Sequence, residues 1–160
     1  MKFCSLLFVA VLLFLGSCKR DRYDDGSNTV DRLVFGTFYG SCDSDCVHMY
    51  QLDNSTICRD DSARFGSLTW AYQFVTRTQL SKPNAVTAKP LLTQVPKELM
   101  TNSNTTFGCP DCHGQGGIYL IVKTIPAIYR FRLDIDNTPD QSAEVIAFKA
   151  KMIDVLKQIR

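Results

Sequence analysis

The segment 118–159 constrains the fold most strongly, because its apolar pattern changes from the period of a strand to that of a helix. Residues 118–125 are nearly all β-formers, and over 129–135 apolar side chains alternate with charged ones. Alternation with a period of two is typical of a strand that buries one face. The two runs therefore predict an antiparallel hairpin whose turn contains Pro126 and Ala127.

A helix is predicted directly after this hairpin. Thr138 is expected as its N-cap, with Pro139 at the first helical position and Gln141 three residues after the cap. We expect the helix to continue to about Ile159. Its apolar side chains recur at spacings of three and four, so one face can pack on a sheet. These apolar positions are Val145, Phe148, Met152, Val155, Leu156 and Ile159, while Lys149, Lys151 and Lys157 lie mostly on other faces.

Two further strands are expected earlier in the chain. Residues 33–40 and 47–52 are rich in aromatic and β-branched side chains, and a cysteine-bearing turn joins them. Weaker signals predict a polar loop at 53–66, a third strand or a short helix around Trp70 at 68–75, and a short helix at 91–100. Strands first and one long helix last predict an α+β fold, in which a mostly antiparallel sheet packs against the C-terminal helix.

The N-terminus has the pattern of an export signal. A short positive segment, Met1-Lys2, is followed by an apolar run from Phe3 to Leu15. This run is too short for a helix that spans the hydrocarbon core, which needs about 20 residues, so we expect a cleaved signal peptide. Leu15-Gly16-Ser17-Cys18 resembles the bacterial lipobox, in which the cysteine becomes the acylated first residue of the mature chain.

Three parts are therefore predicted: a lipoprotein signal peptide at 1–17, the lipidated Cys18 with a tether at 18–31, and one globular domain at 32–160. Acyl chains on Cys18, such as palmitate, would anchor the protein to a membrane of the bacterial cell envelope. Lys19 favours the outer membrane, by resemblance to the sorting rule of enteric bacteria. With 18 basic and 16 acidic residues, the chain shows no clustered positive surface for nucleic acid.

Seven cysteines in 160 residues indicate an oxidising compartment. Five of them lie in the predicted domain and are disulfide candidates: Cys42, Cys46, Cys58, Cys109 and Cys112. Five cysteines can form two bridges and leave one thiol free in fifteen ways, and the sequence does not choose among these. Structural disulfides account for most of the cysteines of an exported domain.

One cysteine pair also matches a cofactor motif. Cys109-Pro110-Asp111-Cys112-His113 has the C-x-x-C-H pattern of haem c attachment, in which two thiols add to the haem vinyl groups and the imidazole binds iron. The sixth iron ligand would come from His48, Met49, Met100 or Met152. The glycine-rich segment 114–117 disfavours the helix on which such motifs commonly lie.

Soft-metal binding and thiol redox chemistry are two further alternatives. The candidate ligands of copper or zinc are Cys42, Cys46, His48, Cys109, Cys112 and His113, together with the thioether of Met49. On a strand Cys46 and His48 share a face while Met49 points to the other, so not all of these groups can converge. A redox C-x-x-C usually lies at a helix N-terminus, whereas this one runs into a glycine-rich turn.

Several segments resemble a group of uncharacterised bacterial lipoproteins. The resemblance rests on Phe35-Gly36-Thr37-Phe38-Tyr39-Gly40-Ser41-Cys42 with Cys46, on the Pro110-Asp111-Cys112 turn with Gly116-Gly117, and on the terminal helix. No activity is assigned to that group. Its turn is usually followed by a small and an acidic residue where this chain has His113, which weakens the haem interpretation. The resemblance implies a shared role for Cys42, Cys46 and Cys112, as bridge rather than cofactor residues.

The function we expect is that of a lipid-anchored envelope protein acting as a binding or structural module. Its partner would be a protein or a small molecule, with no cofactor. Catalysis is not expected, because the sequence lacks a G-x-S-x-G elbow, an H-E-x-x-H motif and a P-loop. The alternative is a haem- or metal-binding redox protein that uses the motif at 109–113.

Overall fold

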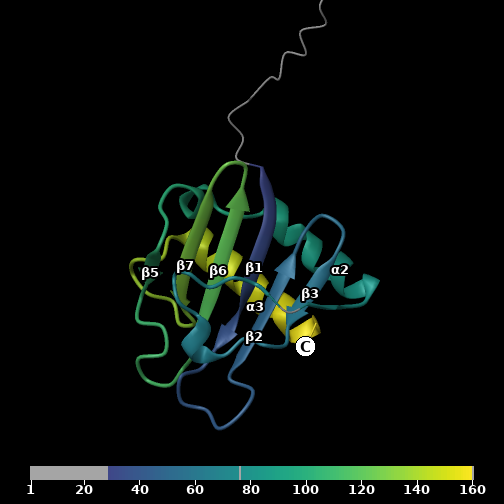
Figure 1. The fold of residues 1–160 in the computed structure, drawn as a ribbon. Helices are drawn as coiled ribbons and strands as arrows, with labels where there is room; N and C mark the ends of the chain where they lie inside the picture. The colour runs from purple at the N-terminus through teal and green to yellow at the C-terminus, as the bar shows by residue number, and fades with distance from the viewer. Residues whose placement is uncertain (1–28, 76, 160) are drawn as a thin grey trace, which may run out of the picture.

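The computed structural model describes residues 29–75 and 77–159, and the predicted signal peptide and Cys18 lie outside them. Seven strands form one sheet in the order β4-β3-β2-β1-β6-β7-β5 (Figure 1). The strands are β1 (Val30–Phe38), β2 (Val47–Leu52), β3 (Ile57–Asp60), β4 (Thr78–Gln79), β5 (Thr105–Phe107), β6 (Gly117–Thr124) and β7 (Ile128–Asp134). All neighbours are antiparallel except β5 and β7, which are parallel. This confirms the predicted α+β fold with a mostly antiparallel sheet.

One long helix, α3 (Ala143–Ile159), crosses one face of the sheet (Figure 1). Phe148 and Met152 of α3 pack in one core cluster with Phe35, Leu120 and Phe131 of the central strands. Shorter elements complete this layer: α2 (Lys82–Ala88), η2 (Lys89–Thr93) and η3 (Lys97–Met100). Each large apolar side chain that is fully buried here stabilises the fold by about 1.5 to 3 kcal/mol.

The opposite face of the sheet is covered by the segment 61–75, which contains the single turn η1 (Phe65–Ser67). Leu68 and Tyr72 of this segment pack on Val34, Met49 and Tyr119. The central strands are therefore buried on both faces, although a long helix covers only one of them.

Local predictions failed where a segment has no periodicity of its own. Strand β3 lies inside the expected polar loop at 53–66, and the segment 68–75 is neither strand nor helix. Two 3-10 turns replace the single helix expected at 91–100, and α2 was not predicted. Strand β1 begins at Val30, within the predicted tether.

The predicted start of the long helix was also wrong. The helix α3 begins at Ala143, and Ser142 Oγ accepts the backbone N–H of Val145 at 3.3 Å. Thr138 instead donates its hydroxyl to Asp140 Oδ1 at 2.5 Å, and its carbonyl accepts the N–H of Gln141 at 3.0 Å. The Thr138–Gln141 segment therefore closes a separate turn in front of the helix.

The strand directions give the sheet two different ends. Val30 of β1 pairs with Thr124 of β6, so the chain enters the sheet beside the β6–β7 turn at 125–127. We call this the tether end (Figure 1). Phe38 of β1 pairs with Val47 and with Gly117, so the loops 39–46 and 108–116 meet at the other end, which we call the loop end. In the described part of the chain no helix is long and apolar enough to cross a membrane.

Candidate binding site at the loop end

Both loops at the loop end are closed by a disulfide between near neighbours in the sequence. Cys42 is bonded to Cys46 and Cys109 to Cys112, with Cα–Cα distances of 5.7 and 5.5 Å. Cys58, which lies on β3, is a free and partly buried thiol. The structure thus selects one of the fifteen pairings that the sequence allows.

This disulfide pairing disfavours the haem and metal alternatives. A sulfur held in a disulfide has no free thiolate for a haem vinyl group or a soft metal ion. The Cys109–Cys112 motif forms turns rather than the start of a helix, and His113 is exposed. His48 lies on β2, where its Nε2 is 3.4 Å from Asp45 Oδ2. Within the described ranges, no three His, Cys, Asp or Glu side chains are arranged to hold a metal ion.

One carboxylate joins the two disulfide loops. Asp111 accepts the backbone N–H of Gly40 at 2.6 Å with Oδ2 and that of Gly116 at 3.0 Å with Oδ1. Its φ of 64° lies in the left-handed region, which Asp tolerates better than most residues. A Cβ at Gly40 would lie 2.3 Å from Asp111 Oδ2, so a larger residue there would displace this carboxylate. Asp111 therefore fixes the positions of the loops relative to each other.

A second carboxylate, that of Asp134, is hydrogen-bonded to the Cys109 loop. Asp134 is buried, and its Oδ2 accepts the backbone N–H of Cys109 at 2.9 Å. Its Oδ1 accepts the N–H of Asp136 at 3.0 Å and the Nε2 of Gln115 at 3.3 Å. Burial alone would raise the pKa of Asp134, but these hydrogen bonds and the charge of Lys149 outweigh it and hold the pKa below its usual range.

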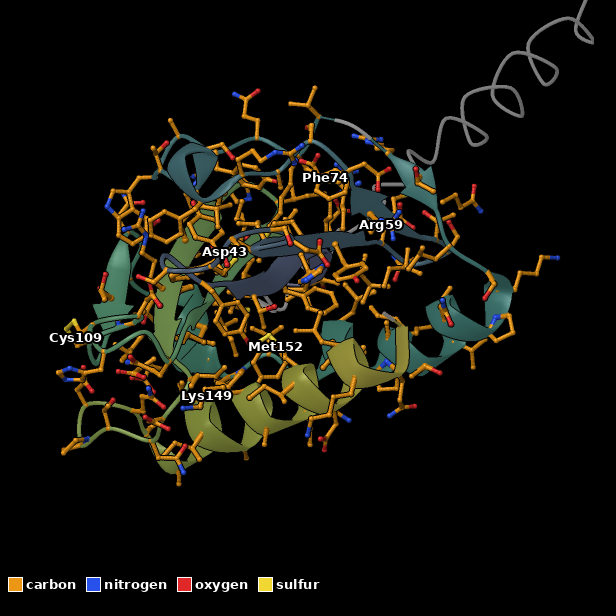
Figure 2. All side chains as sticks on the ribbon, turned by 90° about the horizontal axis from the view of Figure 1, so that it is seen from below. Asp43, Arg59, Phe74, Cys109, Lys149 and Met152 are labelled. Carbon is orange, nitrogen blue, oxygen red and sulfur yellow. A yellow bond between two sulfur atoms is a disulfide. The ribbon has the colours of Figure 1, made fainter. Side chains whose placement is uncertain are left out.

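Lys149 of α3 is buried against the segment that follows β7 (Figure 2). The helix pattern had instead placed it away from the apolar face. Its Nζ donates to the carbonyls of Asp134 and Asp136, at 2.9 and 2.6 Å, and to Gln141 Oε1 at 2.7 Å. Burial lowers the pKa of Lys149, and the carboxylates of Asp134 and Asp136 act in the opposite direction. Lys149 therefore ties α3 to the segment that supports the disulfide loop.

A cavity of about 580 Å³ opens between the Cys109 loop and the segment 65–69. Its apolar lining includes Phe38, Phe65, Leu68 and Pro110. Phe65 is 47% exposed, and its ring centroid lies 5.8 Å from that of Phe38. Phe65 also borders a second cavity of about 570 Å³ on the Cys42 loop. An exposed aromatic ring thus lies between two cavities, each bounded by a disulfide.

Arg132 supplies the positive charge of the first cavity. Its guanidinium donates to the carbonyl of Leu68 and lies 5.0 Å from the centroid of the Trp70 ring, which is the only tryptophan of the chain. Tyr119 lies behind Trp70 and donates its hydroxyl to the carbonyl of Thr69 at 2.7 Å. The guanidinium is therefore held by stacking and by a backbone carbonyl, with no carboxylate among its described partners.

The sequence predicted a role for the cysteines of this site, but it did not predict most of the other residues that line the cavity. Phe65 lies in the expected polar loop, and Arg132 is one of the charged residues that alternate with apolar ones over 129–135, with no binding role predicted for it. The sequence contains one usable signal for Arg132, which is the alternation along β7 that places it beside Tyr119 of β6. Nothing local indicates that the segment 65–69 folds back over these two residues.

No protein-family model matches the chain, and no curated protein matches its sequence.

Proposed function

We propose that this protein is anchored to the outer membrane of a bacterial envelope through a lipid on Cys18, and that its domain binds a ligand without catalysis. The ligand site is the cavity between the Cys109–Cys112 loop and the segment 65–69. The observation that carries the proposal is this apolar cavity with one cationic wall, held by two hydrogen-bonded disulfide loops. The lipobox-like Leu15-Gly16-Ser17-Cys18 supports the anchor.

The lining defines the chemistry of the ligand. Phe38, Phe65 and Pro110 offer apolar contacts, while Arg132 offers N–H donors beyond the one used by the Leu68 carbonyl. Such a combination suits an aromatic or aliphatic group that carries a carboxylate or a sulfonate. The ligand is thus a small molecule or the end of a peptide that pairs an apolar group with an anion.

Binding is favoured over catalysis by the state of the reactive groups. The two cysteines that line the cavity are bonded to each other, and both carboxylate oxygens of Asp111 accept backbone N–H groups. The described lining contains no histidine that could act as a base. A nucleophile next to a base, as covalent catalysis requires, is not assembled there.

Titration with anilinonaphthalene sulfonate, an aromatic anion, tests the cavity. Excitation of Trp70, which stacks on Arg132, should give energy transfer to the bound dye. We expect Phe65→Ser and Arg132→Gln each to weaken binding about tenfold, since each removes a contact worth roughly 1.5 kcal/mol. Val86→Ser is the control, because Val86 is 72% exposed and lies on α2. Equal affinity of all four proteins for the dye would contradict the proposed site.

Replacement of the acylated residue tests the anchor. We expect Cys18→Ala to abolish membrane association, because it removes the thiol that would carry the acyl chains. The measurement is the amount of protein in the membrane and soluble fractions of the producing bacterium. A variant found wholly in the membrane fraction would contradict the lipoprotein proposal.

A further inference from the structure

The tether end carries exposed apolar side chains on the β6–β7 turn. Ile125 is 82% exposed and Ile128 is 42% exposed, and the exposed Pro126 lies between them. These two isoleucines are among only five large apolar side chains exposed in the described part of the chain. An apolar turn of this kind, at the end of a rigid hairpin, is a surface that another apolar phase can cover.

Three cations lie beside this turn on adjacent strands. Arg32 of β1 is the register partner of Lys123 of β6, and Arg130 of β7 is the partner of Ile121, two residues from Lys123. The three side chains therefore share the face of the sheet that also carries Ile121.

No anion on the described chain neutralises this cluster. Among the residues that the structure describes, no carboxylate lies within 4 Å of these three cations, and Asp31, the bulged residue of β1, forms no ion pair with them. The Nε atoms of Arg32 and Arg130 are buried without a hydrogen-bond partner. Cations placed side by side repel one another, so an external anion would relieve the repulsion.

The anchor enters at the same end. Val30 pairs with Thr124, the last residue of β6, so the chain that leads to Cys18 joins the sheet beside the exposed turn (Figure 1). The chain from Cys18 to Val30 makes twelve residue-to-residue steps and can span at most about 43 Å even when fully extended. If Cys18 carries the lipid, the tether end is the part of the domain held closest to the bilayer.

From these three observations we propose that the β6–β7 turn docks on the lipid surface. Ile125 inserts into the interface between headgroups and acyl chains, while Lys123, Arg32 and Arg130 face anionic lipid headgroups. The inference rests on the proposed lipid anchor at Cys18. It implies that the domain has a fixed orientation, in which the cavity beside the Cys109–Cys112 loop faces away from the membrane.

Quenching of tryptophan fluorescence by brominated phospholipid tests the docking in the full acylated protein. Two variants are reconstituted in phosphatidylglycerol-containing vesicles, Ile125→Trp and, as a matched control, Val75→Trp, because Val75 is 73% exposed on the segment that covers the sheet. The unsubstituted protein gives the signal of Trp70. We expect the added signal at position 125 to lose about half its intensity, as for a side chain in the headgroup and acyl boundary, and the added signal at position 75 to be unchanged.

Flotation of the vesicles separates failure of the anchor from failure of the docking. A protein that does not float with the vesicles would overturn both proposals. A protein that floats, but in which position 125 is quenched no more than position 75, would overturn the docking alone and would indicate that the turn faces water or another protein. We further expect Lys123→Glu, or replacement of phosphatidylglycerol by phosphatidylcholine, to reduce the quenching at position 125. Quenching that is indifferent to both changes would overturn the role of the cations.

Discussion

At the scale of single residues, two buried charged side chains, Lys149 and Asp134, stabilise the loop end through several hydrogen bonds each. A buried ammonium is tolerated only when its N–H groups find acceptors, and Lys149 has three, two carbonyls and the side chain of Gln141. The buried carboxylate of Asp134 likewise accepts three hydrogen bonds, two from backbone N–H groups and one from the side chain of Gln115. These two residues connect the core helix to the disulfide loop, so a change in either one reaches the candidate site.

Removal of this ammonium should therefore be costly. We expect Lys149→Met to lower the free energy of unfolding by about 3 kcal/mol, because it removes three charge-assisted hydrogen bonds in the interior and leaves Gln141 Oε1 without a donor, while Gln141 Nε2 still donates to the carbonyls of Asp134 and Asp136. Lys151→Met on the same helix is the control, since Lys151 is exposed and a surface substitution usually changes stability by less than about 0.5 kcal/mol. Urea unfolding followed by far-ultraviolet circular dichroism measures both variants. Equal losses would show that the Lys149 contacts contribute nothing.

The structural role of a residue could be predicted only where a local sequence pattern indicates it. The cysteines of the site and the apolar positions of α3 are visible in the sequence. The burial of Lys149 is not, because its position beside Phe148 is compatible with the edge of the polar face until the turn at 134–141 folds over it. The choice among fifteen disulfide pairings also depends on distances that the sequence does not contain.

At the scale of elements, three turns are closed in the same way, by an aspartate carboxylate that accepts backbone N–H groups from residues two or three positions later. Asp53 closes the β2–β3 turn by accepting the N–H groups of Ser55 and Thr56, and Asp60 and Asp134 do the same for the segments after β3 and β7. In each case burial would raise the carboxyl pKa, but the hydrogen bonds outweigh it and lower the pKa below its ordinary value.

The stability of the domain should consequently depend on acid pH. A carboxyl whose pKa is lower in the folded state stabilises the fold fully above its unfolded pKa of about 4, and this contribution is lost as the pH falls through the folded pKa. We expect the free energy of unfolding to decrease steadily below about pH 4. Asp134→Asn should flatten this decrease, whereas Asp43→Asn, on the exposed Cys42 loop, should not. Urea unfolding between pH 7 and pH 3 is the measurement, and identical profiles for both variants would refute the account.

Elements with a strong internal period were predicted correctly, and elements formed by distant pairing were not. Strand β6 follows from its run of β-formers, strand β7 from alternation, and helix α3 from apolar spacings of three and four. Strand β5 has three residues and exists because it pairs in parallel with β7, more than twenty residues later. Strand β4 has two residues and depends in the same way on β3.

At the scale of the whole molecule, the two proposed functions lie at opposite ends of the sheet. The tether end carries the chain to Cys18, the exposed Ile125 and a cluster of cations. The loop end carries the two disulfides, Asp111 and the cavity beside Phe65. The central strands β1 and β6 connect the two ends and are buried on both faces, so they act as a rigid spacer. This arrangement suits a domain that is held at one end and binds at the other.

The intact mass of the chain purified from bacterial membranes, before and after reduction and alkylation, tests this account most directly. We predict a chain that begins at Cys18, carries the mass of acyl groups and is lighter by two hydrogens for each of two disulfides. Without reduction, alkylation should modify one thiol, Cys58. An unacylated chain would contradict the anchor, and an added haem mass on Cys109 and Cys112 would contradict the binding site and support an electron-transfer protein.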